Sequence, residues 1–185
     1  MPTIAINPEV FRPHLPVVPE SALLARCLRV TAQLPAREEP ADAMSWDVES
    51  RRIERLKQYR PRRAAEQADR WLGQALGEVQ QRQDPESIGL FASALSTWAG
   101  LQRTLGQLGD AALATHHALG RLCPQPASTR AGFACQRAAL VLGDLGETEA
   151  GLRFAEQAVV IHQRTPGEHR HVGTALAGVG AYQLS

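Results

Sequence analysis

The stretch LGQLGD, from Leu105 to Asp110, returns almost unchanged as LGDLGE, from Leu142 to Glu147, in a chain with no obvious strand. A glycine near the end of one helix, followed by an acidic residue in the first turn of the next, is typical of a turn between two helices. We therefore interpret both stretches as turns of helical hairpins. Because the same turn occurs twice, the sequence predicts repeated hairpins.

The period of the repeat follows from landmarks around the turns. The hexapeptides themselves align at an offset of 37, but an offset of 40 brings more landmarks into register. Small residues then recur at positions where two helices would have to touch. The matched pairs are Gly106 and Gly146, Ala111 and Gly151, and Ala118 and Ala158.

Caps and prolines predict where the helices of the later half begin. Asp84-Pro85 offers a cap followed by a proline in the first turn, and Thr165-Pro166-Gly167-Glu168 has the spacing of a capping box around a proline. Pro126 stands midway between Pro85 and Pro166, so the three prolines follow nearly the same period as the turns. We expect the first helix of each hairpin to start near one of these prolines.

The earlier part of the chain differs in composition, because seven of the twelve prolines lie within residues 1–40. Residues 1–20 mix prolines with apolar side chains and predict an extended arm, which lies on its own domain or reaches into a partner or a second copy. Residues 21–82 predict N-terminal helices of a degenerate repeat. Residues 84–185 hold the regular repeats and a lone terminal helix.

The overall composition limits the function classes. The chain has 185 residues, 44% of them hydrophobic, and a formal net charge of +1, which gives no global reason to expect nucleic acid or a membrane surface as partner. It lacks the apolar run of a membrane span and the pattern of a signal peptide, so we expect a cytoplasmic protein. Cys27, Cys123 and Cys135 show no CxxC spacing and predict buried thiols.

Taken together, residues 84–185 resemble the tetratricopeptide repeat family, in the long-linker form common in bacterial regulatory and adaptor proteins. The resemblance implies an all-α fold in which antiparallel helical hairpins stack as a solenoid with a concave groove. An α-hairpin array without the family's superhelix is the alternative. One repeat matches through Leu95 to Ala99, Leu105-Gly106 and Ala111 to Ala118, and the next through Cys135, Ala138-Ala139, Leu142, Leu145-Gly146 and Gly151 to Ala158.

The resemblance also implies a non-catalytic module, an adaptor, chaperone or regulatory subunit, that binds a peptide segment or helix of another protein in the groove. The family's Lys and Asn clamp for a terminal carboxylate is absent, although Arg103 and Arg137 could grip a carboxylate in their own way or remain solvated. A secretion-type chaperone for an apolar client is an alternative. The implied groove positions are Ser93, Ser96, Arg103, Thr104, Phe133, Gln136, Arg137 and Leu140.

A basic run, RRIERLKQYRPRR from Arg51 to Arg63, holds seven positive residues against one acidic residue. On a helix Arg51, Arg55 and Arg62 roughly align, which makes a nucleic-acid-binding helical protein a second alternative. The other interpretation is a solvated helix face whose charges are neutralised by nearby acidic residues.

The sequence gives no positive sign of catalysis. It contains no GxSxG or HExxH motif and no Gly-rich phosphate loop, and its histidines lack the spacing of a metal site. We therefore expect no enzyme activity, no cofactor and no metal. Self-association through the arm or the last helix is compatible with every alternative.

Overall fold

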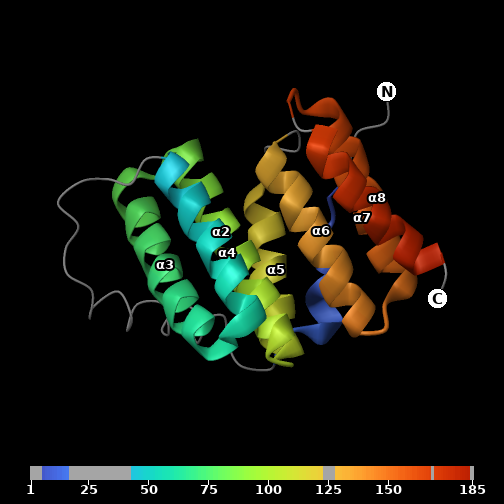
Figure 1. Cartoon of the computed structure of the whole chain (residues 1–185), viewed down its shortest axis with the longest axis horizontal. Coiled ribbons are helices and arrows are strands. Elements are labelled where there is room, and N and C mark those ends of the chain that lie inside the picture. The colour runs from blue at the N-terminus through green and yellow to red at the C-terminus, as the bar shows by residue number, and fades with distance from the viewer. Residues whose placement is uncertain (1–5, 17–42, 123–127, 168, 184–185) are drawn as a thin grey trace.

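The computed structural model describes residues 6–16, 43–122, 128–167 and 169–183, and every regular element in these residues is helical (Figure 1). The predicted all-α class is confirmed for this part of the chain. The elements are the 3-10 helix η1 (Pro8–His14) and the α-helices α2 (Ala43–Tyr59), α3 (Pro61–Arg82), α4 (Pro85–Thr104), α5 (Leu108–Leu122), α6 (Thr129–Asp144), α7 (Thr148–Arg164) and α8 (His169–Gln183).

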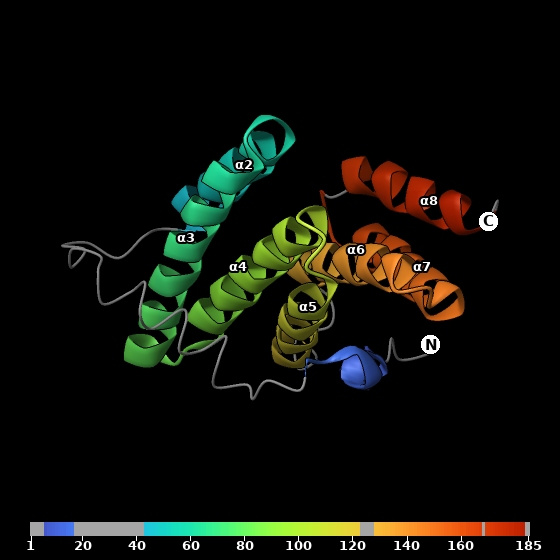
Figure 2. The same cartoon turned by 90° about the horizontal axis from the view of Figure 1, so that it is seen from below.

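The α-helices form two layers. Each packs against the helix that follows it, and α4 also contacts α2 and α6, while α6 also contacts α8. Figure 2 shows α2, α4, α6 and α8 along one side and α3, α5 and α7 on the other, with α2 and α8 standing out at the two ends. We call the surface formed by α2, α4, α6 and α8 the inner face.

The turns after α4 and α6 are equivalent. Gly106 has φ +75° and Gly146 has φ +83°, the left-handed conformation that favours glycine. In both turns the residue after the glycine donates its N–H to a carbonyl five residues earlier, at 2.9 Å, as in the Schellman motif. Gly106 therefore corresponds to Gly146, as the offset of 40 predicted. The offset of 37 would instead match each left-handed glycine with a glycine inside a helix.

Small side chains let neighbouring helices approach closely. Ala118 of α5 and Ala158 of α7 are fully buried, as their repeat positions predicted. Trp98 of α4 is 1% exposed, and its Nε1 donates a hydrogen bond to Asp69 of α3 at 2.7 Å. Cys135 is also buried, as expected, whereas the other two cysteines lie outside the described residues.

The described part of the N-terminal arm lies on its own domain. Residues 8–14 form η1, so the prediction of a fully extended arm is wrong there. The Phe11 ring is completely buried against the ring of Phe154 on α7, and the carbonyl of Pro8 lies 2.9 Å from Nδ1 of His116 on α5. Figure 2 shows η1 beside α5, on the opposite side from α2 and α8.

Of the two helix caps predicted from the sequence, the structure confirms one and contradicts the other. Asp84 caps α4 as predicted, because its Oδ1 accepts the N–H of Ser87 at 2.7 Å. Thr165 instead ends α7, where its hydroxyl donates to the carbonyl of Ile161, and α8 begins only at His169. The predicted capping box is therefore wrong at Thr165. The part of the predicted N-terminal helices that precedes residue 43 lies outside the described residues.

No helix in the described ranges is both long and apolar enough to cross a membrane.

Candidate binding groove

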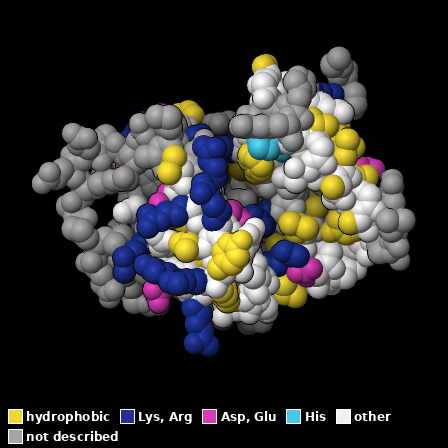
Figure 3. Space-filling model, viewed as in Figure 1, with side chains coloured by type: hydrophobic (Ala, Val, Ile, Leu, Met, Phe, Trp, Pro, Cys, Tyr) yellow, Lys and Arg dark blue, Asp and Glu magenta, His cyan; other side chains and the backbone are white. Residues whose placement is uncertain are grey.

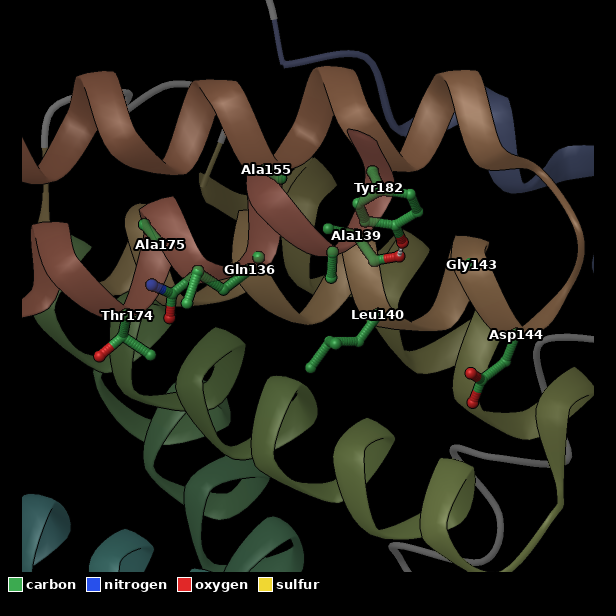
Figure 4. A pocket seen from close by; sticks show the side chains of 12 residues that line it. Gln136, Ala139, Leu140, Gly143, Asp144, Ala155, Thr174, Ala175 and Tyr182 are labelled. Carbon is green, nitrogen blue, oxygen red and sulfur yellow. Dashed lines mark hydrogen bonds between the residues drawn. The ribbon is translucent and has the colours of Figure 1, made fainter. Parts of the chain in front are cut away.

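An open pocket lies on the inner face between α6 and α8 (Figure 4). Its volume is about 460 Å³, and its walls are mostly the carbon atoms of small side chains. We call it the α6–α8 pocket. It is lined by Gln136, Ala139, Leu140, Gly143 and Asp144 of α6, by Ala155 of α7, and by Thr174, Ala175, Ala177, Gly178, Ala181 and Tyr182 of α8.

Tyr182 closes one end of this pocket. Its hydroxyl donates a hydrogen bond to the carbonyl of Ala139, which Figure 4 marks with a dashed line. The ring lies against two glycines, since a Cβ at Gly143 would come within 2.5 Å of the hydroxyl oxygen and one at Gly151 within 2.6 Å. Burial raises the pKa of Tyr182 above its usual value. The two glycines thus create the space in which Tyr182 fastens α8 to α6 and α7.

Two ion pairs tie the helices of the inner face together. Nε of Arg103 on α4 lies 2.8 Å from Oδ2 of Asp144 on α6, at the edge of the α6–α8 pocket. Arg137 reaches from α6 to α2, where its Nη2 lies 2.7 Å from Oε1 of Glu54. The Arg137 guanidinium crosses α4 directly above Gly100, and a Cβ there would overlap it. Both arginines therefore hold carboxylates of this chain.

Basic side chains gather on the α2 end of the inner face. In Figure 3, Lys and Arg side chains collect over α2 and the adjoining α3, whereas hydrophobic side chains show over α6 and α8. Arg55, Arg60, Arg62 and Arg63 are exposed, and no carboxylate of the described chain pairs with them. Arg51 lies three residues before Glu54, on the same side of α2.

The helix break after Tyr59 changes one predicted alignment. Arg51 and Arg55 belong to α2, but Arg62 belongs to α3, which starts at Pro61. The three arginines therefore do not align along one helix.

The predicted groove residues of α6 are found together on the inner face. Gln136 and Leu140 line the pocket, and Arg137 lies one turn before Leu140. Phe133 is 41% exposed, and its ring stands edge-on to that of His171 on α8, with 4.7 Å between ring centroids. The four residues therefore lie on one side of α6, as their helical spacing requires.

The predicted groove residues of α4 are less available. Ser96 is buried, so the prediction that it faces a ligand is wrong. The hydroxyl of Ser93 donates to the carbonyl of Gly89, and that of Thr104 donates to the carbonyl of Gly100. Helix α6 packs against α4 on this side. Among the predicted α4 residues, Arg103 reaches the edge of the α6–α8 pocket, where it pairs with Asp144.

Sequence reasoning missed the α8 wall of the pocket. Thr174 and Gly178 lie four residues apart, and this helical spacing is the signal that could have placed them on one face of α8. Ala177, Ala181 and Tyr182 carry no motif, because small side chains become a wall only when a neighbouring helix stands opposite.

No group of three or more His, Cys, Asp or Glu in the described ranges is arranged to hold a metal ion. In comparisons with known proteins, no family model, curated protein or solved structure matches the chain.

Proposed function

We propose that this chain is a non-catalytic protein-interaction module, a tetratricopeptide-like array whose inner face binds a peptide segment or a helix of another protein. It acts as an adaptor, chaperone or regulatory subunit. The observation that carries the proposal is the open apolar pocket between α6 and α8, because an apolar surface of this kind gains free energy when a partner side chain removes it from water.

The arrangement of the hairpins supports the tetratricopeptide-like part of the proposal. Gly106 and Gly146 form equivalent turns, and the first helices of successive hairpins contact one another on one side of the molecule. In stacked hairpins this arrangement leaves the first helices lining one continuous surface, which suits a long, narrow ligand.

The basic surface over α2 and α3 favours nucleic-acid binding as the second candidate function. Several exposed arginines there lack a carboxylate partner within the described chain, and phosphate contacts need such side chains. A nucleic acid would use this surface and leave the α6–α8 pocket empty.

A capture experiment with two tryptophan variants tests the proposal. Ala177→Trp fills the α6–α8 pocket, and Gly120→Trp places the same side chain at an exposed position of α5, in the other layer. Wild-type chain and both variants are immobilised and exposed to a lysate of the source cells, with and without nuclease.

The proposal predicts one protein retained by wild type and by Gly120→Trp, lost with Ala177→Trp and unaffected by nuclease. Retention by all three chains would place the contact elsewhere, and loss on nuclease treatment would favour the second candidate. If co-expression with this chain raises the solubility of the retained protein, the module acts as a chaperone for an apolar client.

A further inference from the structure

The inner face has an apolar end and a basic end. At the apolar end, the α6–α8 pocket of about 460 Å³ exceeds the volume of one large side chain and lies within the usual range of roughly 300–1,000 Å³ for ligand sites. Leu140 is 41% exposed beside it. An apolar side chain that enters this pocket meets alanine, glycine and leucine carbon atoms, with Gln136 and Thr174 at the rim.

At the basic end, positive charge on α2 is not fully cancelled by the carboxylates around it. Glu54 is already engaged by Arg137, and it also pairs with Lys57 at 2.5 Å. Arg55 is exposed and has no acidic partner within the described residues. Arg55 therefore offers a positive charge that a carboxylate of a partner can complement.

The two ends are close enough for one ligand to touch both. Arg55 directly follows Glu54 on α2, Glu54 pairs directly with Arg137, and Arg137 lies one turn from Leu140 at the pocket. The Glu54–Arg137 pair thus lies between the apolar end and the basic end of the inner face, and we call it the floor of the inner face. An α-helix is about 10 Å in diameter with its side chains, so a helix resting on this floor would reach α2 on one flank and the pocket on the other.

We infer that the partner segment is an acidic amphipathic helix, which places a Leu, Ile, Met or Phe side chain in the α6–α8 pocket and a carboxylate against Arg55. This inference rests on the proposed function and specifies the chemistry of its ligand. An RNA strand is the poorer fit, because its phosphates would satisfy the arginines while the apolar pocket beside them stayed exposed to water.

A peptide selection tests this inference without knowledge of the natural partner. The full chain is immobilised and used to select from a displayed library of randomised peptides of about 16 residues, long enough for roughly 24 Å of helix. Bound peptides are sequenced, and the most enriched one is synthesised with a fluorescent label. Its affinity is measured by fluorescence anisotropy, beside that of a labelled oligouridine RNA.

Three variants locate the contacts. Ala177→Trp blocks the pocket, Arg55→Glu reverses the charge at the basic end, and Arg164→Glu makes the same charge change at an exposed position of α7. We expect selected peptides to be rich in Asp and Glu around an apolar anchor. The α2 reversal should weaken binding by roughly tenfold and the α7 reversal by less than about twofold, and Ala177→Trp should abolish binding.

The failures are distinguishable. Selected peptides that are neutral or basic, or that bind the α2 reversal as tightly as wild type, would overturn the acidic partner while leaving groove binding intact. If no peptide is enriched over the Ala177→Trp chain, the proposed function fails as well. If oligouridine binds more tightly than any peptide and ignores Ala177→Trp, the basic end serves nucleic acid.

Discussion

At the scale of single residues, the two hairpin turns depend on glycine because the backbone is left-handed at Gly106 and Gly146. Gly106 at φ +75° and Gly146 at φ +83° have no atoms crowding the position of a Cβ, so backbone conformation alone demands glycine. Both glycines could be identified from the sequence, because a left-handed backbone conformation strongly restricts which residue can occupy the position.

Replacing one of these glycines therefore has a predictable effect. Gly106→Ala should lower the free energy of unfolding by about 1 kcal/mol, because alanine is strained at positive φ. Gly120→Ala is the matched control inside α5, where the same change should raise stability by about 0.5–1 kcal/mol. Urea denaturation measures both, and equal effects of the two substitutions would contradict the turn assignment.

Close helix contacts give a second prediction for a single residue. Ala118 is fully buried where α5 meets its neighbours, so Ala118→Leu should destabilise the fold by about 1–3 kcal/mol through overpacking. Ala177→Leu at an exposed position of α8 is the control and should change stability little. Unchanged denaturation of the Ala118→Leu chain would mean that α5 is rotated from the position described.

At the scale of elements, α8 depends on Tyr182 for its place. The ring fills the space left by Gly143 and Gly151, and the hydroxyl binds the carbonyl of Ala139. The sequence predicted a terminal helix but placed its start at Pro166, because a Thr-x-x-Glu spacing looks the same whether its threonine begins one helix or ends another. Only the packing of α7 distinguishes the two cases.

The raised pKa of Tyr182 predicts how stability depends on pH. Burial favours the neutral phenol, so the pKa is higher in the folded than in the unfolded chain, where a tyrosine titrates near about 10. The stabilising contribution is complete below that pH and disappears as the pH rises toward the folded pKa. We expect urea stability to fall more steeply above about pH 10 for wild type than for Tyr182→Phe, and parallel curves would contradict this.

The conformation and the packing of the short helix η1 could not be predicted from local sequence patterns. Its prolines predicted an extended arm, yet a 3-10 turn suits proline as well, because it uses similar φ values and few N–H donors. No local sequence pattern predicted that Phe11 would be completely buried, because its site is formed by α7 and α5, which lie far along the chain.

At the scale of the whole molecule, η1 and the inner face should act independently because they lie on opposite sides. Phe11→Ala is expected to lower the free energy of unfolding by about 3 kcal/mol, as for other buried phenylalanines. The folded variant should bind the selected peptide as wild type does. Arg12→Ala on exposed η1 is the control, with a change within about 0.5 kcal/mol. Tighter peptide binding by Phe11→Ala would mean that the arm competes for the groove.

The candidate groove could be predicted from the sequence only in part. The repeat register located Phe133, Gln136, Arg137 and Leu140 on one side of α6, since helical periodicity fixes which residues share a face. It did not indicate that Arg137 pairs with Glu54, because that contact joins residues far apart in the sequence. Contacts between distant segments depend on how hairpins stack, and single-sequence patterns do not encode that geometry.

Site-specific photo-crosslinking in the source cells tests the central claim most directly. A photoreactive amino acid replaces Leu140 in the α6–α8 pocket or, as the control, exposed Glu156 on α7 in the other layer. The proposed function predicts a protein adduct of defined mass from position 140, absent from position 156 and resistant to nuclease. Protein adducts of equal yield at both positions, or an adduct that nuclease removes, would contradict a protein-binding inner face.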